Sequence, residues 1–165
     1  MDGVHQYKCG ACLSLARIGQ SDQPNPQTGY ANSVGYGIAP DGRVIGTSYD
    51  TSGNARATRW MPGSSTGVDM LDSPGGAQGN TWVYAVNQQN RVCGAAIMAS
   101  NNKRQALISV ADALNLNSYE FGSYAGSSFE SEALALNGGG QVVGDTQVSS
   151  TVSRPFLKQV PYGSA

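Results

Sequence analysis

Large and small residues alternate at the start of three separate stretches of the chain. In the first stretch, Val34, Tyr36 and Ile38 alternate with Gly35 and Gly37. A period of two residues is the pattern of a β-strand. The alternation returns with Trp82, Tyr84 and Val86, and again with Leu134 and Leu136. Each stretch is therefore expected to begin with a strand that carries its large residues on one face.

The three stretches are copies of one repeat. They align without a gap as residues 33–60, 81–108 and 131–158. A fixed repeat of about 48–50 residues indicates a solenoid, a propeller or another radial array. A valine, a glycine and an arginine recur at fixed places. The recurrent glycines are Gly46, Gly94 and Gly144, the arginines Arg56, Arg104 and Arg154, and the valines Val44, Val92 and Val142.

Each repeat is expected to contain three strands or more. Short turns at residues 40–42, 88–90 and 138–140 are rich in Pro, Gly, Asn and Gln, and they follow the first strands as hairpin turns do. Second strands are expected at 43–49, 91–98 and 141–148, and third strands at 55–60, 103–109 and 154–160. A weaker fourth strand falls at 67–71, and residues 110–117 form either a strand or one helical turn. The predicted class is all-β, in a single domain over residues 1–165.

The N-terminal residues supply a further strand. Residues 12–19 (CLSLARIG) have a strand-like pattern and stand before the first repeat, where a fourth strand would lie. Pairing the two ends of a radial fold removes open sheet edges. We therefore expect this N-terminal strand to complete the last sheet by pairing near Phe156.

Three repeats of four strands are compatible with several architectures. Blades of the β-propeller type are the first interpretation, although propellers usually have four to eight blades. Two chains together would give six blades, or the chain would be part of a longer array. A three-sheet β-prism or a β-trefoil is the alternative.

The hairpins resemble a known bacterial family. Residues 135–137 (ALN) and 140–144 (GQVVG), together with 85–87 (AVN) and 91–94 (RVCG), resemble the A-x-A-I-N-x-x-G-x-V-V-G hairpin of HAF-type extracellular repeats. The triplet that names this family is replaced here by RAT, RQA and RPF. The resemblance implies secretion or display on the bacterial cell surface and a propeller-like fold. It implies no established chemistry, so no catalytic residue is carried over.

Charge and motifs narrow the range of partners. Ten basic residues stand against eleven acidic ones, and only 13% of residues are charged. Such a balance gives no electrostatic basis for binding nucleic acid. No apolar run is long enough for a membrane span. The chain has no Walker loop and no dinucleotide-binding glycine pattern before a helix, so no cofactor is expected.

The cysteines are candidates for a structural role. Cys9 and Cys12 form a C-x-x-C pair, and Cys93 lies far from them. The pair is either a disulfide, two buried thiols or a redox dithiol. A zinc site is not expected, because His5 is the only histidine and no second C-x-x-C occurs. A disulfide would indicate an oxidising compartment, although the N-terminal residues lack the apolar region of a signal peptide.

An aromatic segment is the main candidate for a binding site. Residues 117–130 (NSYEFGSYAGSSFE) interleave Tyr119, Phe121, Tyr124 and Phe129 with Ser and Gly. Recognition loops use rigid aromatic side chains among small polar residues, and aromatic rings stack on sugar faces. The other interpretation is that these rings cover the core beneath a long loop.

Charged residues suggest two further sites. The recurrent Arg56, Arg104 and Arg154 either line a ring that binds anions or pair with nearby loops and carboxylates. Glu130 and Glu132 would lie about 7 Å apart on one face of a strand, a spacing that suits a glycosidase pair. The other interpretation is that both glutamates lie at the solvent-exposed start of that strand and have no catalytic role.

The sequence therefore predicts a non-catalytic binding module, extracellular or on the cell surface, which recognises a glycan or a partner protein. The alternative is a structural protein that forms homo-oligomers or filaments. A polysaccharide-acting hydrolase is a further alternative.

Overall fold

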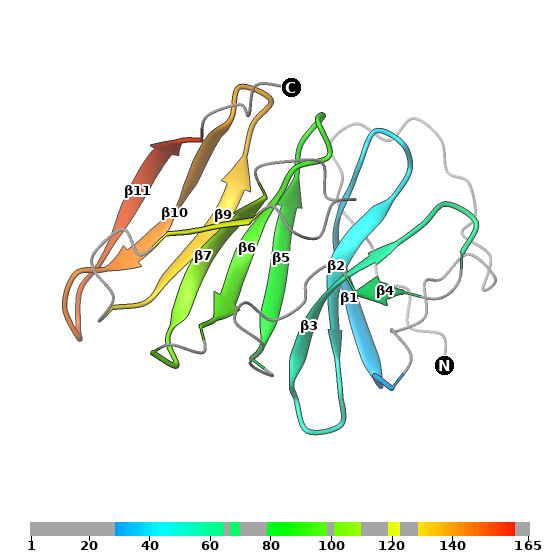
Figure 1. The fold of residues 1–165 in the computed structure, drawn as a ribbon, viewed down its shortest axis with the longest axis horizontal. Coiled ribbons are helices and arrows are strands. Elements are labelled where there is room, and N and C mark those ends of the chain that lie inside the picture. The colour runs from blue at the N-terminus through cyan, green and yellow to red at the C-terminus, as the bar shows by residue number, and fades with distance from the viewer. Residues whose placement is uncertain are drawn as a thin grey trace, which may run out of the picture.

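Three antiparallel β-sheets follow one another along the chain (Figure 1). The computed structural model describes residues 29–64, 67–69, 79–98, 101–109, 119–122 and 129–160. Each sheet contains one of the predicted repeats. The all-β class and the three repeated units are therefore confirmed.

The strands of each sheet are neighbours in sequence order. The first sheet contains β1 (Asn32–Ile38), β2 (Val44–Tyr49), β3 (Ala55–Trp60) and β4 (Val68–Asp69). The second contains β5 (Thr81–Val86), β6 (Val92–Ile97), β7 (Arg104–Ser109) and β8 (Tyr119–Gly122). The third contains β9 (Ser131–Leu136), β10 (Gln141–Gln147) and β11 (Ser153–Gln159).

The predicted hairpin turns between first and second strands are confirmed. Gly42, Asn90 and Gly140 occupy the same place in the three turns, with φ of 85°, 59° and 78°. Glycine and asparagine tolerate this left-handed conformation better than other residues. The first two strands of each sheet are therefore joined in the same way.

Each first strand contains a β-bulge, which the alternating pattern did not predict. One residue has no partner on the second strand, so the register shifts there. These extra residues are Tyr36, Tyr84 and Leu134. The prediction of uninterrupted alternation along the first strands is wrong at this position.

The bulge explains the recurrent glycines. A Cβ on Gly46, Gly94 or Gly144 would overlap a main-chain carbonyl oxygen of the bulged strand, that of Val34, Trp82 or Glu132 respectively. Only a residue without a side chain permits this approach.

The recurrent arginines are not equivalent in the structure. Arg56 lies opposite Ser48, and Arg154 lies opposite Thr146. In the second sheet this place belongs to Gln105, opposite Ala96, whereas Arg104 lies opposite Ile97. The hairpin between β6 and β7 is thus one residue longer than the others. The prediction of an alignment without a gap is wrong after this loop.

Each sheet stacks on the one before it. β5 packs against the first sheet and β9 against the second. The cluster at the first junction contains Ile45, Val83 and Leu107, and that at the second contains Cys93, Ile108 and Ala133. A hydroxyl also joins each pair of sheets. The main-chain N–H of Ala57 donates to Thr81 Oγ1 (2.9 Å), and that of Ala106 donates to Ser131 Oγ (3.0 Å).

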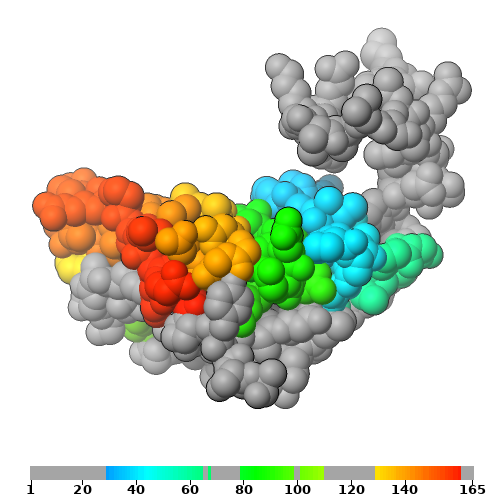
Figure 2. All heavy atoms as spheres, turned by 90° about the horizontal axis from the view of Figure 1, so that it is seen from above, coloured from blue at the N-terminus to red at the C-terminus, as the bar shows by residue number. Residues whose placement is uncertain are grey.

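The described strands form an open row. The first and third sheets lie at opposite ends of the molecule, as Figure 2 shows from above. Among the described residues, β11 pairs with β10 alone and no strand closes the row into a propeller. The predicted closing strand at 12–19 and the segment 110–117 lie outside the described residues.

Candidate functional site

Two tyrosines at the bulges meet on adjacent first strands. The rings of Tyr36 on β1 and Tyr84 on β5 make an edge-to-face contact, with centroids 5.9 Å apart and planes at 85°. Tyr36 is 44% exposed, whereas Tyr84 is half-buried. Because both bulges occur at the same repeat position, the repeat itself places these rings side by side.

An ion pair continues this surface toward the third sheet. Arg104 on β7 forms a salt bridge with Glu132 on β9. The Arg104 guanidinium also lies 4.5 Å from the centre of the Trp82 ring, a cation–π contact. We call Tyr36, Tyr84, Trp82, Arg104 and Glu132 the aromatic row. It draws residues from all three sheets.

The pKa values of two tyrosines in this region, Tyr84 and Tyr49, are raised. Burial raises the pKa of Tyr84, and the neighbouring Glu132 carboxylate raises it further as a charge and as a hydrogen-bond partner. Burial, followed by a hydrogen bond with Tyr36, raises the pKa of Tyr49 to about 12. In the aromatic row, the Tyr84 phenol therefore stays protonated beside an ion pair whose two charges compensate each other.

A shallow groove lies at the hairpin ends of the same first strands. Its volume is about 370 Å³. All three sheets line it, through Ile38, Pro40, Val86, Asn87, Gln88, Leu136 and Gly138.

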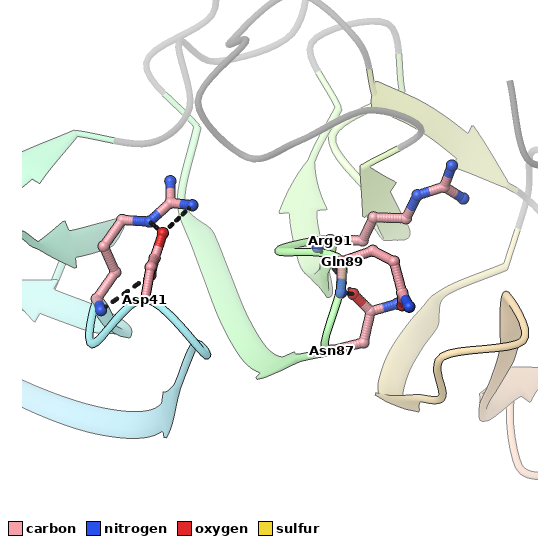
Figure 3. A network of polar contacts seen from close by, with 5 residues as sticks. Asp41, Asn87, Gln89 and Arg91 are labelled. Carbon is pink, nitrogen blue, oxygen red and sulfur yellow. Dashed lines mark hydrogen bonds and ion pairs between the residues drawn. The ribbon is translucent and has the colours of Figure 1, made fainter. Parts of the chain in front are cut away.

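Polar contacts fix the turns that border this groove (Figure 3). Asn87 Oδ1 accepts hydrogen bonds from the main-chain N–H groups of Gln89 (3.0 Å) and Arg91 (2.9 Å). Asn87 Nδ2 donates to the carbonyl of Asn137 (3.0 Å), which joins the second and third turns. In the first turn, Asp41 pairs with Arg43 (2.6 Å). These contacts within the protein fix the turns that form the rim of the groove.

The predicted aromatic segment is not wholly a loop. Tyr119 and Phe121 lie on β8, which pairs with β7, so a strand replaces the expected loop over 119–122. Tyr124 and the side chains of Tyr119 and Phe121 lie outside the described residues. Phe129 accepts a hydrogen bond at its carbonyl from Gln105 Nε2 (2.9 Å). A ligand site in this segment stays a prediction.

The recurrent arginines differ in setting as well as in register. Arg104 is engaged with Glu132, Arg56 is half-buried, and Arg154 is exposed on β11. The burial of its own site lowers the pKa of Arg104, but the hydrogen bond and charge of Glu132 outweigh this and raise it overall. The three side chains are therefore not equivalent, and anion binding by them stays a prediction.

Cys93 is a buried free thiol, so its candidacy for a disulfide is wrong. Burial raises its pKa to about 12. A thiol with such a pKa is a poor nucleophile at neutral pH. Cys9 and Cys12 lie outside the described residues, and their pairing stays a prediction.

The two candidate glutamates are held differently. Glu132 is engaged by Arg104 and Tyr84, and Glu130 precedes β9 and accepts a hydrogen bond at its carbonyl from Gln147 N (2.8 Å). The hydrolase alternative stays a prediction.

Within the described ranges, no three His, Cys, Asp or Glu side chains gather as metal ligands. The same ranges contain no helix with the length and apolar character needed to cross a membrane. No family model, curated protein or solved structure matches the chain. The resemblance to HAF-type repeats therefore stays a prediction.

Sequence reasoning did not find this site, since the predicted ligand residues lie in the aromatic segment. Tyr36, Trp82 and Tyr84 belong to the alternating large positions, and that pattern indicated a strand rather than a binding surface. No sequence pattern indicates the contact between Arg104 and Glu132. This contact depends on the extra residue in the hairpin between β6 and β7 and on the packing of β9 against the second sheet.

Proposed function

We propose that this chain is a non-catalytic binding module and that the aromatic row binds a neutral glycan. The observation that carries the proposal is the exposed Tyr36 ring beside Tyr84, continuous with the Arg104–Glu132 pair. Aromatic rings provide contact area at low entropic cost, and the C–H faces of sugars pack on them.

The polar groups favour a neutral ligand. Arg104 and Glu132 compensate each other, so the row offers no surplus charge to an acidic or basic ligand. Tyrosine hydroxyls donate hydrogen bonds, and the Glu132 carboxylate accepts them. Hydroxyl groups of a sugar can use both kinds of partner.

We also propose that the three sheets are propeller-type blades and that the protein is secreted or displayed on a cell surface. The first strand of each later sheet packs on the face of the preceding sheet, which supports blades more than a β-prism or β-trefoil. The hairpin resemblance to HAF-type repeats supports the location.

The test is binding of the full chain to an array of immobilised neutral and acidic oligosaccharides. We expect binding to a neutral glycan, and a loss of affinity of about tenfold or more in Tyr36→Ala. Tyr36→Phe keeps the ring and should retain most of the binding. Val152→Ala, at an exposed position in another hairpin, is the control.

Two results would overturn the proposal. One is unchanged glycan binding by Tyr36→Ala at an unchanged melting temperature. The other is loss of binding only in Tyr119→Ala with Tyr124→Ala, which would place the ligand on the predicted aromatic segment instead.

A further inference from the structure

The outer face of the third sheet exposes apolar residues that the other sheets bury. Leu157 on β11 is 67% exposed, whereas Ile108, at the same register position on β7, is 1% exposed. Val143 on β10 is likewise exposed, and its equivalents Ile45 and Cys93 are buried. Ile45 and Cys93 belong to the clusters that join one sheet to the next. The third sheet thus presents the surface on which a following sheet would stack.

The opposite end of the row presents the complementary surface. Ile38 on β1 is 69% exposed. Its equivalents Val86 and Leu136 pack against the clusters of the preceding junctions. The first sheet therefore carries the side chain that normally contacts a preceding sheet.

We propose that a second copy of this chain supplies that sheet. The third sheet of each copy stacks on the first sheet of the other. Because the ends of the described row lie apart, the same chain does not bring its own third sheet to β1. Two such junctions related by a twofold axis close a ring of six sheets, within the usual range for propellers. This inference is independent of the glycan site.

Pro155 makes the junction between copies different from those within the chain. Ala57 and Ala106 donate their N–H groups to Thr81 and Ser131 across the internal junctions. Pro155 occupies the equivalent place on β11 and has no N–H. Ser33 is the counterpart of Thr81 and Ser131 on the first strand. Its hydroxyl therefore meets no N–H donor at this place on β11 of the partner copy. The junction should be weaker than the internal ones, so that dimer and monomer exchange.

Association is tested by sedimentation equilibrium of the full chain over a range of concentrations. We expect a monomer–dimer equilibrium that ends at twice the chain mass. Leu157→Asp and Ile38→Asp each place a charge in the apolar junction and should raise the dissociation constant about a hundredfold or more. Val152→Asp introduces the same charge at another exposed apolar position, outside the stacking face, and should leave the constant unchanged. Melting temperatures of dilute monomers check that each variant is folded.

Three results would overturn the proposal. They are a monomer at every concentration, a filament, and a dimer that both aspartate variants leave intact.

Discussion

The strands β7 and β11 are copies of one repeat element in two different surroundings. β7 is almost entirely buried, because it pairs with β8 and the third sheet stacks on its face. β11 is largely exposed, since its described pairing is with β10 alone. The difference teaches that the repeat sequence specifies the strand, whereas the neighbouring sheet determines how much that strand contributes to stability.

The same comparison separates two kinds of stabilising contact. The bulge and its glycine lie within one sheet, and in the second and third sheets the glycine faces the equivalent carbonyl oxygen of the bulged strand. At Gly144 the Phe156 ring of the same sheet also lies close. The apolar contacts of Ile108 and Leu157 depend on a neighbouring sheet and differ completely. Substitutions at these positions should therefore behave differently.

The largest effect is expected from truncation at the buried member of the pair. Ile108→Ala should lower the free energy of unfolding by about 3 kcal/mol, because it opens a cavity in the junction. Leu157→Ala should change it by only about 0.5 kcal/mol in the monomer. Urea denaturation at concentrations below dimer formation measures both. Equal losses would show that β11 is already covered in the monomer.

An intermediate effect is expected at the bulge glycines. Gly94→Ala and Gly144→Ala both push a Cβ into a carbonyl oxygen, and each should cost about 2 kcal/mol of unfolding free energy. Gly35→Ala is the matched control, because its Cβ would lie 3.4 Å from Val44 Cγ1, an ordinary contact. A clear difference between Gly94 and Gly144 would contradict the view that the bulge is independent of the neighbouring sheet.

The smallest effect concerns Tyr49 in the first sheet. Its pKa of about 12 exceeds the ordinary value of 10.0, so the folded chain holds this proton more tightly than the unfolded chain. The resulting stabilisation is complete below pH 10 and is lost as the pH rises through about 12. Urea denaturation in alkaline buffers should show this decline, and Tyr49→Phe should reduce it. An identical decline in Tyr49→Phe would assign the loss to other groups.

Local chemistry made most of the fold predictable. Period-two alternation located the first strands, and Gly or Asn at the left-handed turn position located the hairpins. The bulges were not predicted, because an inserted residue can be recognised only when the strand is compared with its partner strand. The extra residue in the hairpin between β6 and β7, before Arg104, was not predicted for the same reason.

The candidate site was not predicted from the sequence. Tyr36 and Tyr84 stood out only as large residues at a shared repeat position, which indicated a strand. Their edge-to-face contact and the salt bridge of Arg104 with Glu132 join residues from different sheets. Pairs so distant in sequence depend on how the sheets stack, which no local pattern records.

The sequence by itself determined the class, the number of repeats and the course of each hairpin, because turn geometry and strand periodicity act between residues close in the chain. Only the tertiary structure decided which faces are buried, where each arginine lies and which strands remain open. Those properties arise from apolar contacts between sheets, and the same repeat position can be buried in one sheet and exposed in the next.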